Sequence, residues 1–86
     1  MAQIGKSACA GTTESSDAYV EVVPADKNSI EIESAVLAQF GDDIRKAAED
    51  VLSDVGIENA AMRIVDQGAL DCVIRARVEA ALRRAL

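Results

Sequence analysis

The chain has 86 residues, half of them hydrophobic, and a formal net charge of −6 at pH 7. This length corresponds to one domain, near the lower end of the sizes that fold without disulfides or metal. The acidic balance argues against non-specific binding of nucleic acid. Two cysteines and no histidine exclude a disulfide framework and a Ser-His-Asp or Cys-His catalytic centre, and they leave too few soft ligands for zinc.

The first segment of the chain, residues 1–16, is rich in Ala, Gly, Ser and Thr and shows neither helical nor strand periodicity. Such a segment buries too little apolar surface to offset its ordering entropy. We therefore predict a flexible arm over residues 1–16 and a single domain over residues 17–86. The chain has neither a secretory signal nor the roughly 18 apolar residues of a membrane span, which predicts a cytoplasmic protein without a membrane partner.

Two strands are expected at the start of the domain. Residues 17–23 are dominated by Val and Tyr, and Pro24 ends the run. Residues 29–33 alternate strictly, with Ile on one face and Glu on the other. With the turn between them, the two segments predict an antiparallel hairpin that has one solvated face.

Two helices and a third strand follow. The first helix is expected to begin between residues 35 and 41 and to end at Gly56, a typical helix stop. Residues 61–65 are expected to form the third strand, and the last helix is expected to cover about residues 69–85. The order ββαβα predicts an α+β fold, in which a three-stranded sheet carries both helices on one face. The apolar faces of the helices are expected to include Phe40, Ile44, Ala47, Ala48, Val51, Leu52, Val55, Leu70, Val73, Ile74, Ala76, Val78, Ala80, Ala81 and Leu82.

Three residues are candidates for function. Ser15 and Ser16 end the predicted arm, where a hydroxyl is accessible to a modifying enzyme, although a serine pair before a strand is more often only a turn. Arg77 lies in the middle of an apolar helix face. It must extend to solvent, pair with a carboxylate, or contact an anion or a partner, because an unpaired buried guanidinium is destabilising. The chain contains no phosphate-binding loop or nucleotide motif, and nothing in it is typical of an active site.

Four stretches of the chain resemble the acyl carrier protein (gamma) subunits of citrate lyase, and the similarity runs from about Ala8 to Ala81. The stretch from Gly68 to Glu79 is the most specific, and the order of the four makes the resemblance strong. They are Ala10-Gly11-Thr12-Thr13-Glu14-Ser15, Gln39-Phe40-Gly41-Asp42 with Ile44-Arg45, Asp50-Val51-Leu52, and Gly68-Ala69-Leu70-Asp71-Cys72 with Arg75-Ala76-Arg77-Val78-Glu79.

The resemblance implies a carrier that does not itself catalyse a reaction. Members of this family hold phosphoribosyl-dephospho-coenzyme A on a serine through a phosphodiester, and a separate prosthetic-group transferase attaches it. They present acetyl and citryl thioesters to the transferase (alpha) and lyase (beta) subunits. By resemblance the serine is Ser15, preceded by Glu14. The next position is often Gly in the family but is Ser16 here, which makes Ser16 the second candidate.

Alternatives remain open from the sequence. The chain is also compatible with a carrier of citramalate lyase or, more remotely, of malonate decarboxylase. A small interaction module without a covalent group would have the same composition. Its contact surface would be a sheet edge or the last helix, which is mildly cationic.

Overall fold

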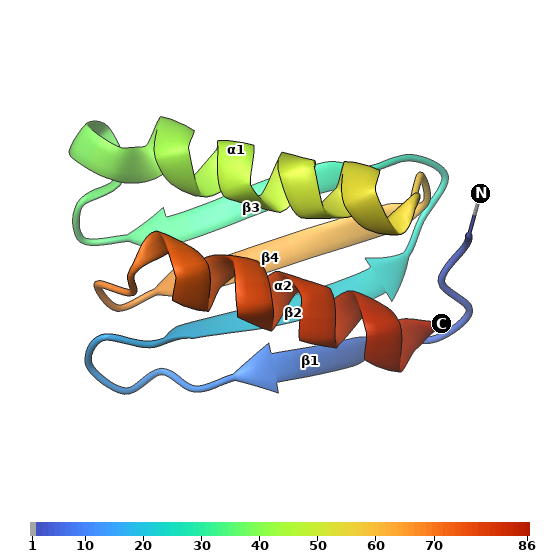
Figure 1. Ribbon diagram of the computed structural model, residues 1–86, viewed down its shortest axis with the longest axis horizontal. Coiled ribbons are helices and arrows are strands. Elements are labelled where there is room, and N and C mark those ends of the chain that lie inside the picture. The colour runs from blue at the N-terminus through green and yellow to red at the C-terminus, as the bar shows by residue number, and fades with distance from the viewer. Residues whose placement is uncertain (1) are drawn as a thin grey trace.

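The computed structural model describes residues 2–86. These residues form one four-stranded sheet and two helices, and both helices lie on one face of the sheet (Figure 1). The sheet order is β1-β2-β4-β3; β1 and β4 run antiparallel to β2, and β3 runs parallel to β4. The predicted α+β class is therefore confirmed. The elements are β1 (Ala8–Gly11), β2 (Ala18–Pro24), β3 (Ser29–Ser34), α1 (Leu37–Val55), β4 (Ala60–Asp66) and α2 (Asp71–Ala85).

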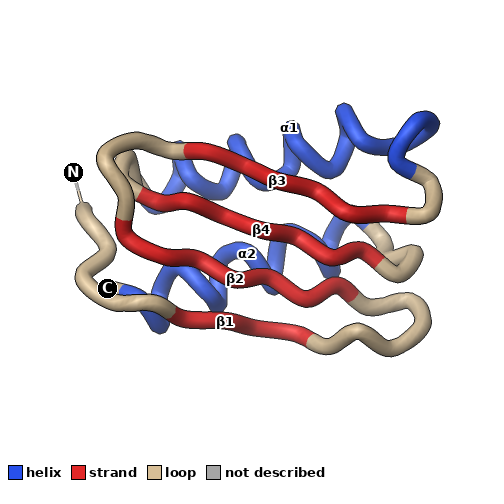
Figure 2. Tube along the Cα trace, turned by 180° about the vertical axis from the view of Figure 1, so that it is seen from behind, coloured by secondary structure: helices blue, strands red, loops and turns tan. Residues whose placement is uncertain are grey.

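Only one face of the sheet is covered by the helices, as Figure 2 shows from behind. Alternate residues of β2 and β4 are buried against the helices, as strand geometry requires. The opposite face is polar: Arg63, in the central strand β4, forms ion pairs of 3.2 Å with Glu21 on β2 and 3.0 Å with Glu33 on β3. The sheet thus has the one-sided burial that the sequence pattern predicts.

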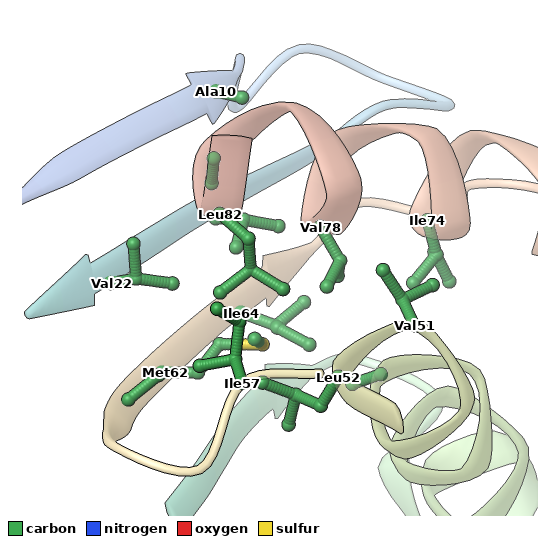
Figure 3. Close-up of a cluster of buried hydrophobic side chains, with 14 of the residues drawn as sticks. Ala10, Val22, Val51, Leu52, Ile57, Met62, Ile64, Ile74, Val78 and Leu82 are labelled. Carbon is green, nitrogen blue, oxygen red and sulfur yellow. The ribbon is translucent and has the colours of Figure 1, made fainter. Parts of the chain in front are cut away.

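The core between sheet and helices is made of aliphatic side chains and alanine. In Figure 3, side chains of α1, α2 and the sheet point toward one another. The buried positions recur every three or four residues along each helix, which is the spacing of one helix face. They are Ile44, Ala47, Ala48, Val51 and Leu52 on α1, and Ile74, Val78, Ala81, Leu82 and Ala85 on α2.

The limits of α1 agree with the prediction. The helix begins at Leu37, inside the expected interval of residues 35–41. Its last residue is Val55, and it is capped by Gly56, which has φ 81° and whose N–H donates to the carbonyl oxygens of Leu52 and Ser53. A glycine at this position satisfies orphan carbonyls in a conformation that other residues adopt only with strain.

The predicted pairing of the first two strands is wrong, because β4 lies between β2 and β3. The turn before β3 does not close a hairpin. Instead the side chain of Asn28 accepts a hydrogen bond from the N–H of Ala60 (2.9 Å) and donates one to the carbonyl of Ile57 (2.8 Å). The connection therefore crosses the start of β4. The strand β3 then joins β4 in parallel through α1, as parallel strands require a crossover.

The predicted flexible arm is wrong over residues 2–11, while residue 1 lies outside the described residues. Ile4 is 3% exposed and belongs to the core, and its backbone N–H and carbonyl both bond to the side chain of Asn59. Residues Ala8–Gly11 form β1 at the sheet edge. The sheet therefore has four strands instead of three. Small residues at Ala8 and Ala10 carry little strand propensity, so pairing with β2 and contact with α2 determine this strand.

Gly11 ends β1 with φ 91°. A Cβ atom at this position would overlap the carbonyl oxygen of Ala18 and lie 3.1 Å from Cδ of Arg77. Both the backbone conformation and the lack of space therefore require glycine.

We expect Gly11→Ala to lower the free energy of unfolding by more than about 2 kcal/mol, because it combines backbone strain with a steric overlap. Urea unfolding of the purified chain measures this change. The matched control is Gly5→Ala, since nothing lies within 4 Å of a Cβ atom there, and its expected effect is within about 0.5 kcal/mol. Equal effects of the two substitutions would contradict this assignment.

Candidate functional site

The loop of residues 12–17 joins β1 to β2 and carries both candidate serines. It lies at the end of the sheet where the β4–α2 connection and the start of α1 also lie (Figure 1). The N–H of Asp17 donates to the carbonyl of Glu14 (3.2 Å), which closes a turn with Ser15 and Ser16 at its centre. Both serines are exposed. The structure thus brings Ser15 and Ser16 to the tip of a loop that is anchored at both ends.

Ser16 has φ 67° and is the one non-glycine residue with positive φ in the described part of the chain. Positive φ at the second central residue is typical of a type II turn, where glycine is preferred. The N–H of Ser16 donates to the carbonyl of Gln67 (2.7 Å), and the N–H of Gln67 donates to the carbonyl of Asp17 (2.9 Å). These bonds fix the backbone of Ser16 against the β4–α2 connection.

Asp17 holds the base of the loop. Its carboxylate accepts hydrogen bonds from Nε and Nη2 of Arg77, both at 3.0 Å, from Oγ1 of Thr12 at 2.7 Å, and from the N–H of Ala18 at 2.7 Å. A bidentate guanidinium contact of this kind is among the stronger polar interactions in proteins. Arg77, then Thr12 and Ala18, hold the pKa of Asp17 far below its ordinary value of 3.8. Asp17 is therefore ionised at any pH near neutrality.

Arg77 has a carboxylate partner, which is one of the three alternatives that the sequence leaves open. The side chain of Arg77 is 40% exposed and that of Asp17 is 15% exposed, so the pair lies at the edge of the core. The chain has fifteen acidic residues, and no sequence signal distinguishes Asp17 from the others as the partner. The contact of Arg77 with an anion or a partner stays a prediction.

A groove of about 550 Å³ lies at the same end of the molecule, between the first turns of α1 and α2. Val36, Phe40, Ile44, Leu70 and Ile74 form its apolar lining. The sequence predicts that Phe40 and Leu70 belong to buried helix faces, but they are 45% and 72% exposed. This part of the prediction is wrong because both residues lie at the N-terminal ends of their helices, where the two helices leave the groove between them.

The β4–α2 connection, which forms part of the groove, is shaped by Asp66. This residue is 4% exposed, and its carboxylate accepts hydrogen bonds from Oγ of Ser34 and from the N–H of Ala69, both at 2.9 Å. The second bond closes a tight turn around Gly68, which has φ 83°. Asp66 is therefore a structural carboxylate, and the sequence pattern did not indicate it.

Two kinds of site are not found among residues 2–86. No group of three or more His, Cys, Asp or Glu side chains there is arranged to hold a metal ion. Neither helix is long and apolar enough to cross a membrane.

Comparison with known proteins identifies relatives over nearly the whole chain. A family model described as malonate decarboxylase delta subunit, an acyl carrier protein, matches residues 5–85. The citrate lyase acyl carrier protein of Treponema denticola is 47% identical over 83 residues, which are 96% of this chain and 95% of the relative. That of Clostridium perfringens is 51% identical over 85 residues, covering 96% of this chain and 84% of the relative.

The fold is also similar to that of solved structures. A crystal structure from Thermus thermophilus matches with a TM-score of 0.58 at 11% sequence identity. The match covers 96% of this chain and 16% of that chain. At this identity the likeness concerns the fold alone.

We expect Arg77→Met to release the base of the serine loop. Without the guanidinium, the amides of Ser16 and Gln67 should exchange with solvent about tenfold faster, since a charge-assisted, bidentate contact is lost. Hydrogen exchange followed by NMR measures both amides. The control is Arg83→Met, because within residues 2–86 Arg83 forms an ion pair with exposed Glu79 alone, on its own helix, and it should leave both rates unchanged. Unchanged rates in Arg77→Met would disprove the anchoring role.

The ion pair also predicts a pH dependence of stability. Because the folded-state pKa of Asp17 is lowered, its contribution to stability is complete above about pH 4 and is lost as the pH falls below that value. The urea midpoint of the wild type should therefore fall more steeply between about pH 4 and pH 2 than that of Asp17→Asn. Parallel curves for the two proteins would show that Asp17 is not stabilised by its partners.

Proposed function

Because the chain belongs to the family of citrate lyase acyl carrier proteins, we propose that it carries the acyl group of citrate lyase on a covalent arm at Ser15. The single observation that supports this site most strongly is the exposure of both serines at the centre of the turn of residues 14–17. A modifying enzyme must surround the hydroxyl that it modifies, and a turn at the tip of an anchored loop allows such access.

The arm implied by the family is phosphoribosyl-dephospho-coenzyme A. When bound, it supplies a thiol that holds acetyl and citryl groups as thioesters. Ser15 would hold it through a phosphodiester at Oγ. Ser16 is the weaker candidate because its backbone is fixed by the bond to Gln67 and its φ is 67°. Ser16 also stands at a position where the turn favours glycine, and these features support Ser15 as the attachment residue.

The charges around the loop are compatible with a phosphodiester. Glu14 and Asp17 flank the serine pair, and two free carboxylates would repel a phosphate. Arg77 neutralises Asp17 through the bidentate contact. This pairing lowers the negative potential at the attachment site without placing a cation at the serine itself.

Tethering gives the carrier its advantage. A thioester on an arm reaches neighbouring active sites at a high effective concentration, which a freely diffusing donor lacks. The loop is held by β1, β2 and the contact with α2, so the arm would pivot about a fixed point. The partners in this proposal are the transferase (alpha) and lyase (beta) subunits of citrate lyase and the prosthetic-group transferase. The chain itself performs no catalytic step in it.

A second candidate is the carrier of malonate decarboxylase, which the description of the matching family model favours. The relatives at 47% and 51% identity are citrate lyase carriers, and they support citrate lyase as the first proposal. Acyl exchange with citryl, citramalyl and malonyl donors in the reconstituted complexes distinguishes these carriers. A scaffold without a covalent group would support none of the exchanges.

We expect the wild-type chain to gain mass when it is co-expressed with a prosthetic-group transferase, and Ser15→Ala to lose this gain completely. Intact-mass spectrometry measures the difference. The matched control is Ser16→Gly, which should retain the gain and raise the free energy of unfolding by roughly 0.5–1 kcal/mol through relief of the left-handed conformation. A gain that survives Ser15→Ala would move the site elsewhere, and no gain in the wild type would refute the proposed carrier.

A further inference from the structure

Exposed apolar side chains are concentrated near the serine loop. The exposed large hydrophobic residues of the described chain are Val23, Val36, Leu37, Phe40, Leu70 and Leu86. Three of them, Val36, Phe40 and Leu70, line the groove between α1 and α2, and Leu37 is the first residue of α1 beside it. The groove volume of about 550 Å³ lies within the range of small-molecule sites, which is about 300–1,000 Å³.

The groove and the serine turn are linked by a short path. Ser16 donates to the carbonyl of Gln67 at 2.7 Å, and Gly68, the next residue, lines the groove. Ser15 therefore precedes the donor of this hydrogen bond, and Gly68 follows its acceptor. With about 3.8 Å between successive Cα atoms, the groove begins within about 12 Å of Ser15.

Both cations at the rim of the groove are already paired, and the lining also carries the acidic residues Asp43, Asp66 and Asp71. Arg75 bonds to Asp71 and Asp50, and Lys46 bonds to Asp50. Neither cation is therefore free for a phosphate. A groove that has an exposed aromatic ring, acidic residues and no free cation suits an uncharged, planar ring better than a phosphate.

We propose that this groove binds the adenine ring of the arm on Ser15, with Phe40 as the stacking surface, an inference that rests on the proposed function. In phosphoribosyl-dephospho-coenzyme A, only a phosphodiester and sugar units separate the serine from the adenine, so the purine is the aromatic ring nearest the serine. Purines stack on aromatic side chains irrespective of base-specific hydrogen bonds. The docked ring leaves the pantetheine end and its thiol free to reach other subunits.

The test begins with the loaded protein. Intact mass first establishes that the arm is attached, and a chain that cannot be loaded contradicts the proposed function. The NMR amide spectrum of the loaded chain is then compared with that of unloaded Ser15→Ala. We expect shift changes at Phe40, Gly68 and Leu70 as well as in the serine loop. Loading with changes confined to residues 12–17 would overturn this inference and leave the carrier function intact.

Two variants separate stacking from mere apolar contact. Phe40→Leu should accept the arm in full but lose the shift changes at Gly68 and Leu70, because it keeps an apolar side chain and removes the ring. The matched control is Val23→Ala, since Val23 is 43% exposed on the opposite face of the sheet, and it should retain those changes.

Adenosine added to the unloaded wild-type chain should shift the same amides, and Phe40→Leu should weaken this binding about tenfold or more. If the groove amides respond only to added alpha or beta subunit, and neither to loading nor to adenosine, the groove is a protein interface and the inference is wrong.

Discussion

Asp17 and Arg77 join two segments that lie 60 residues apart in the chain. The contact holds the end of the β1–β2 loop against the last helix, so the serine turn has a fixed position in the domain. Its geometry depends on Gly11, because a side chain there would meet both Ala18 and the stem of Arg77. A glycine, a carboxylate and an arginine together therefore determine where the two exposed hydroxyls lie.

The same contact affects the chemistry of the loop. Arg77 neutralises the charge of Asp17 beside the serines. The hydrogen bonds of Gln67 with Ser16 and Asp17 hold the turn beside the β4–α2 connection. The exposed turn and the apolar groove consequently occupy one end of the molecule. The other faces are different in character, since the open side of the sheet carries the ion pairs of Arg63. This asymmetry supports the proposal that the functional site lies at this end of the domain.

Much of this arrangement follows from local sequence patterns. Periodicity, strand propensity and the positions of Pro and Gly predict α1, α2, β2, β3 and β4. The strand β1 could not be predicted in this way, since Ala and Gly have weak intrinsic preferences and the strand depends on pairing with β2. The central place of β4 depends on the side chain of Asn28 and on the crossover through α1, neither of which hydrophobic patterning encodes.

In the candidate site, too, some features follow from the sequence and others depend on long-range contacts. The resemblance to citrate lyase carriers singles out Ser15, and the apolar helix face marks Arg77 as unusual. The partner of Arg77 could not be identified from sequence, because a long-range ion pair leaves no local pattern. Phe40 and Leu70 were expected in the core because helix periodicity does not reveal that a helix extends beyond its neighbour.

Fragment mass mapping of the chain isolated from its native cells tests the central claim most directly. Digestion and tandem mass spectrometry locate any covalent group to a single residue. A phosphodiester-linked group on Ser15, within the loop that Asp17 and Arg77 hold, is the result predicted here. An unmodified loop in protein taken from cells that actively cleave citrate would contradict the account.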